Sequence, residues 1–317
     1  MKKSILSLAV LTCGLFSLTA NAAVDWAITT TSGNNTTPAP AYGNTRTYST
    51  SAVSVDVKAF AATSGSNTGT TNTSSADSSR NSRVLESAYL ANYGTPNGLG
   101  VVNRDGSNTA AVAVNSATGA DGNEYVNGGS EHAMDNNGRS EVMLLTFSEA
   151  VALKSLTVGW PAMSANPPDT DLFVLAWIGT GNPTAALTTK TFADIAVDSF
   201  DGGNGWSLVA NLSNVVTSSS NVANFNGTTT PVSSSYWLVG TGGFANATAT
   251  TAGGVNSGDS GKALGATGAN YDYVKLAGIG GSIAQPPGNN VPEPGSLGLA
   301  GLALFGITAL RRKKSTQ

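Results

Sequence analysis

The chain has almost no cysteine: among its 317 residues only Cys13 is one. It lies inside an uncharged N-terminal stretch that we expect to be removed. The preceding Val10-Leu11-Thr12 does not suit lipid attachment, which wants a small residue just before the cysteine. We therefore expect a body without thiols, which excludes disulfides, thiol catalysis and cysteine metal sites.

Charged residues are also few, at 11% of the chain, and His132 is the only histidine. Six of the 16 lysines and arginines lie in the two terminal segments, but only Glu293 of the 19 acidic residues does. Residues 23–290 therefore keep ten basic and eighteen acidic groups, a net charge of −8 against −3 for the whole chain. Nucleic-acid binding needs clustered basic residues that neutralise phosphates, so we expect no nucleic-acid partner.

The N-terminus has the three parts of a secretory signal peptide. A short basic start is followed by the uncharged, apolar residues 5–18 and then by Ala20-Asn21-Ala22. This apolar run is shorter than the roughly 20 residues of a membrane span. We therefore predict that residues 1–22 form a signal helix, which the Sec translocon receives and signal peptidase cuts between Ala22 and Ala23.

The C-terminus carries a second segment of this kind. Pro292-Glu293-Pro294 precedes the uncharged residues 296–310, and the basic residues 311–314 follow. Proline does not fit a helix interior, so a helix begins after the second proline. This 15-residue helix reaches about 22 Å at ~1.5 Å per residue, short of a ~30 Å hydrocarbon core. We predict a short transmembrane helix at 296–310, with the basic end in the cytoplasm and the body outside.

These parts, in this order, resemble the PEP-CTERM sorting domain over residues 291–314. The resemblance implies that exosortase, a membrane-embedded cysteine transpeptidase, recognises Pro292, Glu293 and Pro294, with Arg311 and Arg312 in the basic end. An ordinary tail anchor is the alternative. We therefore expect export across the inner membrane of a Gram-negative bacterium, a transient anchor there, and a final place at the cell surface or in the extracellular matrix.

The body, residues 23–285, is predicted to be all-β. Helical patterns are scarce, and only residues 82–93, ended by Gly94, favour a short helix. Glycine, serine, threonine, asparagine and alanine are abundant, which suits strands joined by polar turns. We expect an antiparallel, jelly-roll-like β-sandwich with long polar loops. The best-supported strands are 47–60, 141–147, 153–160, 171–178, 206–210, 236–240 and 271–277.

Two low-complexity segments, residues 61–82 and 242–268, are predicted to be long flexible loops, because they hold too few apolar side chains to order themselves. Residues 286–290 form a linker to the sorting signal. Tryptophans would stack on sugar rings if exposed, but these lie in or beside apolar strands, so core packing is expected for most of them. They are Trp26, Trp160, Trp177, Trp206 and Trp237.

The segment 131–139 holds the densest set of unusual side chains. It resembles a group of exosortase-dependent surface proteins that share a His-Ala-x-Asp-Asn-x-Gly-Arg core. That resemblance covers about residues 125–280 and implies location, because the group's molecular activity is not established. The residues that carry the core are His132, Ala133, Asp135, Asn136, Gly138 and Arg139.

Two interpretations of this segment remain open. In the first, it binds a ligand through His132, Asp135, Asn136 and Arg139 together with Asp169 and Asp171, and calcium, which takes oxygen ligands, is held at Asp135, Asp169 and Asp171. In the second, Asp135 and Asn136 cap a turn while Arg139 pairs with an acid such as Asp171. No other cofactor is expected.

Catalysis is weakly indicated. Gly258-Asp259-Ser260-Gly261 resembles a serine-protease segment, but Lys262 replaces the next glycine and the surroundings are low-complexity. Paired carboxylates of a glycoside hydrolase become visible only in three dimensions. We therefore name no catalytic residue and expect a non-enzymatic surface protein. Its association with exopolysaccharide is implied by the exosortase resemblance. The alternative is a secreted carbohydrate-binding or glycoside hydrolase-like protein.

Overall fold

A computed structural model describes thirteen stretches of the chain, nearly all within one compact unit, Ala23–Ile283. The predicted sorting signal and almost all of the predicted signal helix lie outside the described residues, as does most of the predicted loop 61–82. The described stretches are 21–29, 34–35, 42–63, 83–103, 125–126, 129–130, 133–136, 140–161, 170–200, 205–216, 220–245, 254–256 and 272–284.

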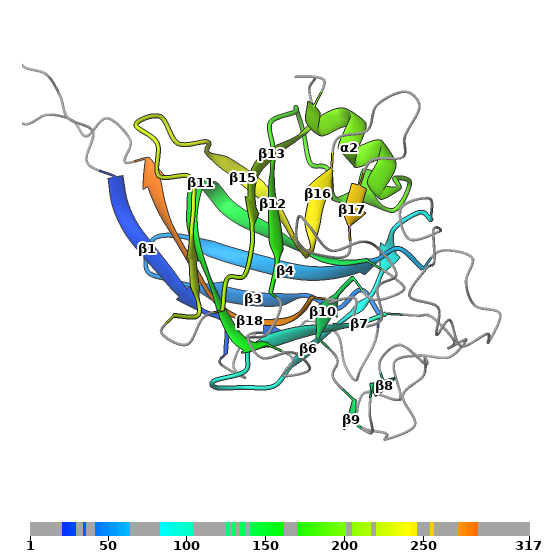
Figure 1. Cartoon of the computed structure of the whole chain (residues 1–317). Coiled ribbons are helices and arrows are strands. Elements are labelled where there is room, and N and C mark those ends of the chain that lie inside the picture. The colour runs from blue at the N-terminus through cyan, green and yellow to red at the C-terminus, as the bar shows by residue number, and fades with distance from the viewer. Residues whose placement is uncertain are drawn as a thin grey trace, which may run out of the picture. The chain divides into compact units, whose positions relative to one another are not determined.

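The all-β prediction is confirmed. Within the described stretches, fourteen strands form one large, mostly antiparallel sheet, beside two short two-stranded ladders and two short helices (Figure 1). The elements are β1 (Asn21–Ala27), β2 (Asn34–Asn35), β3 (Arg46–Ser49), β4 (Ser54–Ala61), β5 (Glu86–Ser87), β6 (Tyr89–Asn92), β7 (Leu99–Val102), β8 (Tyr125–Val126), β9 (Gly129–Ser130), β10 (Met134–Asp135), β11 (Glu141–Pro161), β12 (Leu172–Trp177), α1 (Thr184–Leu187), α2 (Phe192–Phe200), β13 (Trp206–Leu212), β14 (Val222–Asn224), β15 (Ser234–Thr241), β16 (Gly243–Ala245), β17 (Gly254–Asn256) and β18 (Tyr273–Ala284).

Strand β11 runs through both halves of the sheet: the first half contains its residues 141–147, and the second half contains its residues 151–161. Its residues 141–147 pair with β4, and 142–146 pair with β15. After an irregularity it continues as residues 151–161 beside β18. The two strands predicted at 141–147 and 153–160 are therefore one strand, since no glycine or proline separates them and the exposed residues 148–150 absorb the bend.

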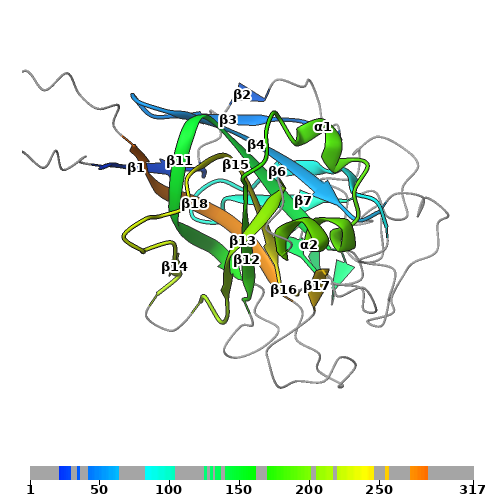
Figure 2. The same cartoon turned by 90° about the horizontal axis from the view of Figure 1, so that it is seen from above.

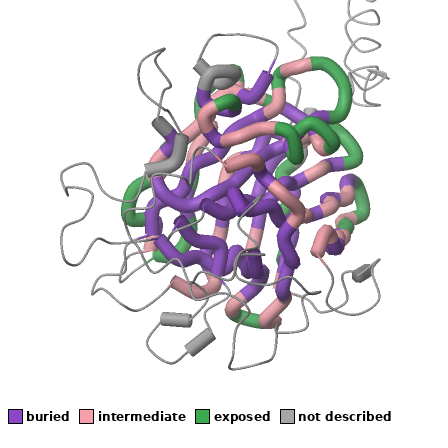
Figure 3. The backbone as a smooth tube through the Cα atoms, turned by 90° about the vertical axis from the view of Figure 1, so that its right-hand side faces the viewer, coloured by how far each residue is buried: buried purple, intermediate pink, exposed green. Residues whose placement is uncertain are grey.

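Both faces of the first half are buried, as the continuous apolar runs predict. In β11, Met143 and Leu145 enter an inner core that also takes side chains from β1, β7 and β18. The alternate residues Val142 and Leu144 enter an outer core with Phe192 and other side chains of α1, α2 and β16. Figure 3 shows these buried strands at the centre and the exposed segments outside them. Because successive side chains of a strand point to opposite faces of the sheet, β11 contributes side chains to both cores.

The helix predicted at 82–93 is wrong. The segment forms β5 and β6, and β6 pairs with β7 through contacts such as Leu90 opposite Val101. The side-chain amide of Asn44 also bonds to both the N–H and the C=O of Leu90. Such pairing and burial outweigh a weak local helix preference. Gly94 does end the segment, with φ of +67° in the turn that follows.

Two features of the fold are absent from our predictions. Helix α2 has a reciprocal cap, in which the Asp194 carboxylate accepts from the Thr191 N–H and the Thr191 hydroxyl accepts from the Asp194 N–H. Strands β16 and β17 lie inside the loop predicted at 242–268, so that prediction is wrong there. Phe244 supplies the reason, because its side chain is buried in the outer core.

The buried Tyr48 gives stability a dependence on alkaline pH. Burial raises its pKa to about 12, against lowering effects of Arg46 and the Asn92 amide. The folded protein then holds the phenol proton more tightly than the unfolded chain, so this stabilisation is complete below pH 10 and lost as pH rises through about 12. Relative to Tyr48→Phe, the wild type should lose about 2 kcal/mol of unfolding free energy across that window. Urea unfolding from pH 9 to 12 measures this, and parallel curves would contradict it.

Candidate functional site

Three of the six predicted ligand residues lie in the described stretches, and all three are buried. Asp135 ends β10, Asn136 follows it, and Asp171 directly precedes β12. The other three, His132, Arg139 and Asp169, lie outside the described residues. The structure therefore tests only part of the predicted cluster.

Asn136 is tied to a residue far along the chain. Strand β10 pairs with the start of β18, which brings Asn136 beside Asp272. The Asn136 Nδ2 donates to Asp272 Oδ2 at 2.9 Å, and the Asp272 N–H donates back to Asn136 Oδ1 at 3.0 Å. The Asn136 side chain thus bridges two strand ends, which the turn-capping interpretation did not include.

Asp272 also holds the start of β12. Its Oδ1 accepts from the Asp171 N–H at 2.6 Å, and Asp171 Oδ1 in turn accepts from the Asn214 N–H at 2.8 Å. Asp272 is fully buried. A chain of hydrogen bonds therefore joins β10, β18, β12 and the turn after β13 at one end of the sheet.

A second carboxylate, Glu141 at the start of β11, is fixed in a similar way. Its Oε1 accepts from Asn103 Nδ2 at 2.9 Å, and its Oε2 accepts from the Asp135 N–H at 3.1 Å. We did not predict Glu141, Asp272 or Asn103 as members of the cluster. The available signal was position, because each lies next to the end of an apolar strand segment.

This strand-end network consists of Asn103, Asp135, Asn136, Glu141, Asp171 and Asp272, and all six are buried. Buried carboxylates that accept hydrogen bonds from backbone and amide N–H groups stabilise the positions of the strand ends that they connect. Among the residues with described positions, no three His, Cys, Asp or Glu side chains form a group that could hold a metal ion. The calcium proposed at Asp135, Asp169 and Asp171 stays a prediction, since Asp169 is outside the described part.

The tryptophans divide into two groups. Trp26, Trp206 and Trp237 are buried, as predicted, and Trp26 points into the inner core. Trp160 and Trp177 are only half-buried. These two rings, from opposite halves of the sheet, are the ones that reach the surface.

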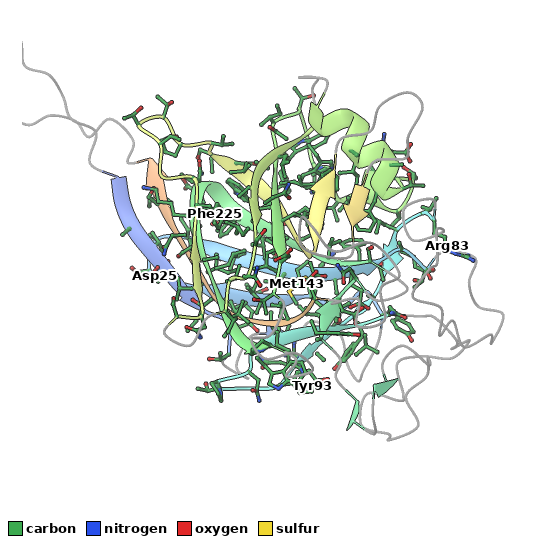
Figure 4. The ribbon with its side chains drawn as sticks, in the orientation of Figure 1. Asp25, Arg83, Tyr93, Met143 and Phe225 are labelled. Atoms are coloured by element: carbon green, nitrogen blue, oxygen red, sulfur yellow. The ribbon has the colours of Figure 1, made fainter. Side chains whose placement is uncertain are left out.

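Both half-buried rings are held in place. The Lys275 ammonium lies 3.4 Å from the ring centroid of Trp160 and 4.8 Å from that of Tyr93, a residue labelled in Figure 4. Trp177 packs edge-on against Trp206, with 5.5 Å between centroids. A cation over an aromatic face stabilises both groups, so Trp160 is already occupied by Lys275.

Comparison with known proteins adds one finding about the C-terminal segment. Residues 290–313 match the family model of the PEP-CTERM protein-sorting motif. No curated protein matches the chain, and neither does any solved structure. No helix in the described stretches is long and apolar enough to cross a membrane. The resemblance inferred from Pro292-Glu293-Pro294 is thus confirmed: the chain carries a PEP-CTERM sorting domain.

Proposed function

We propose that this chain is a non-enzymatic protein of the cell surface or extracellular matrix, associated with exopolysaccharide. One observation carries the proposal, the sorting motif at residues 290–313, which indicates exosortase-dependent sorting to the cell surface. Exosortase is accordingly its processing partner. The large antiparallel sheet is the cargo that this signal delivers.

The route is part of the proposal. Residues 1–22 act as a signal helix for the Sec translocon and signal peptidase, and residues 296–310 as a transient helix in the inner membrane of a Gram-negative bacterium. The support is the order of basic, apolar and small residues at the N-terminus and the basic cluster at the C-terminus. The proposed body is a jelly-roll-like sandwich, supported by an inner core that draws on both halves of the sheet.

A non-enzymatic role is supported by the state of the carboxylates. Glu141 and Asp272 accept hydrogen bonds from main-chain and amide N–H groups and are buried. A glycosidase needs two carboxyl groups that face a substrate with separated pKa values. Buried carboxylates with these hydrogen bonds are suited to holding strand ends together and not to transferring a proton to a substrate.

Carbohydrate binding is the second candidate, and the half-buried ring of Trp177, which no cation of the described residues covers, favours it. Exposed aromatic faces are suited to the apolar faces of sugars, because they bury a large area at a low cost in side-chain entropy. A glycoside hydrolase-like activity remains the enzymatic form of this alternative.

Removal of the sorting segment tests the main proposal. A chain lacking residues 291–317 should leave the surface fraction, because exosortase has no motif to recognise. Cell fractionation followed by immunoblotting measures the distribution. The matched control lacks only residues 315–317, which follow the motif, and should be sorted like the wild type. Unchanged surface attachment of the longer deletion would refute exosortase-dependent sorting.

A further inference from the structure

A row of side chains crosses the outer face of the first half of the sheet. Thr47 lies opposite Asp56, Asp56 opposite Thr146, and Thr146 opposite Tyr236. The ladder of β12 with β15 ends at Ala176 opposite Trp237, and antiparallel register sets the next residue, Trp177, beside Tyr236. We call these five residues, from β3, β4, β11, β15 and β12, the outer row.

The outer row points away from the inner core. In each strand at least one sequence neighbour of the row residue enters that core, as Val55 and Val57 do on β4 and Trp237 does on β15. Because side chains alternate between faces, the row residues lie on the opposite face. Tyr236 and Trp177 accordingly pack against the rim of the outer core.

The row lies where the cover over this face ends. Two residues away from the row, on the same face of three of its strands, the side chains are fully buried in the outer core. They are Leu144, Leu175 and Leu238. Figure 2 shows α2 beside β13, β16 and β17, away from β3. All five row residues are half-buried, so part of each side chain reaches solvent. The row is a strip at the boundary between covered and open sheet.

One end of the strip is aromatic and rigid. Trp177 packs on Trp206, and its Nε1 donates to the Gly181 carbonyl at 3.1 Å, so the indole ring is held from two sides. Tyr236 follows it in the row. Rings that are fixed before binding lose little conformational entropy when a flat ligand stacks on them.

The other end is polar. Thr146 presents a hydroxyl group, and the Asp56 carboxylate accepts from the Thr47 hydroxyl at 2.5 Å. Five strands spaced about 4.8 Å apart make the row about 19 Å long. The row therefore has aromatic rings at one end and hydroxyl and carboxylate groups at the other. This arrangement matches a ligand that has both apolar faces and hydroxyl groups. A sugar chain several residues long has this chemistry.

The charges of the strip select among polysaccharides. Asp56 and Lys58 share the outer side of β4, two residues apart, and both are half-buried. Their opposite charges balance locally, so the strip has no excess positive charge to attract an anionic polymer, and the net negative charge of the body disfavours one further. We propose that the outer row binds an uncharged polysaccharide chain lying across the strands. This inference specifies the exopolysaccharide association of the proposed function, on which it rests.

Native affinity electrophoresis of the full-length protein tests the site. The probes are hydroxyethylcellulose, which is uncharged, alginate, which is anionic, and the exopolysaccharide purified from the producing bacterium. We expect the wild type to bind hydroxyethylcellulose more tightly than alginate. Trp177→Ala and Tyr236→Ala should each weaken binding about tenfold, equivalent to about 1.4 kcal/mol. Ile178→Ala removes a large apolar side chain, 48% exposed, next to the row and should change nothing.

A milder variant protects the test against unfolding. Thr146→Val keeps the shape of the side chain and removes only the hydroxyl, so it should weaken binding about fivefold with the rings intact. Tyr236→Phe keeps the ring and should bind nearly as the wild type does.

The outcomes separate the two proposals. Exopolysaccharide binding that the row variants leave unchanged supports the proposed function and overturns the row. Binding of hydroxyethylcellulose alone, weakened by the row variants, supports the row and contradicts the exopolysaccharide association. Loss of exopolysaccharide binding in the row variants supports both. A preference for alginate, or no binding of any probe by the wild type, overturns the row.

Discussion

Gly98→Ala should destabilise the protein by about 3 to 5 kcal/mol. Gly98 closes the turn after β6 with φ of +86°, and a Cβ there would lie 2.1 Å from the Leu276 carbonyl oxygen. That atom belongs to the backbone of β18, inside the sheet, so it has no side-chain freedom with which to yield. The turn would have to lift away from β18, separating Leu99 from its partner Leu276.

Gly94→Ala is the matched control in the same turn. Gly94 also has a positive φ, +67°, but a Cβ there would meet nothing within 4 Å. Alanine should therefore cost only the strain of the left-handed conformation, about 1 to 2 kcal/mol. Urea unfolding of both variants beside the wild type measures the difference. Equal losses would show that backbone conformation, and not the close approach to Leu276, dominates at Gly98.

Asp272→Ala should cost about 4 kcal/mol of unfolding free energy. The carboxylate accepts from Asn136 Nδ2 and from the Asp171 N–H, and both donors are buried. Without the carboxylate, each donor is left buried without an acceptor, because water does not reach it. Each unsatisfied donor costs about 1–3 kcal/mol of unfolding free energy. The ends of β10, β12 and β18 should loosen together.

An exposed acid gives the control for this prediction. Glu149→Ala, in the solvent-exposed bend of β11, removes a carboxylate of the same charge and should change stability by less than about 0.5 kcal/mol. Hydrogen exchange adds a local measurement, since the Asp171 and Asn214 amides should lose protection in Asp272→Ala but not in Glu149→Ala. Normal protection of both amides in Asp272→Ala would mean that other groups hold these strand ends.

Sequence reasoning identified the strands with strong patterns and failed where pairing or burial decides. The runs at 141–147 and 171–178 were correctly predicted as strands, because their apolar residues are continuous. Residues 82–93 were wrongly predicted as a helix, since pairing with β4 and β7, which are distant parts of the chain, makes them extended. The buried side chain of Phe244 anchors a segment whose composition indicated a loop, and composition does not show where one apolar side chain packs.

Three residues of the predicted ligand cluster lie in one hydrogen-bonded network, and ligand binding by them stays a prediction. Asp135, Asn136 and Asp171 do come together, although 36 residues of sequence separate the first from the last. Their central partner, Asp272, comes from another 101 residues further on. No local pattern marks such a partner, because the hydrogen bonds that join them exist only when β10 and β18 pair.

The sequence by itself determined the sorting signal, because this signal is a short linear motif that is identified by the order of its residues. It also determined the all-β class, which follows from strand patterns and turn residues. Tertiary structure decided which polar side chains are buried in hydrogen bonds between strand ends and which side chains reach the surface. Trp237 and Trp177 both occupy apolar strands, yet Trp237 is fully buried and Trp177 is half-buried at the edge of the covered sheet. The difference is which face each residue occupies and where the covering helices end.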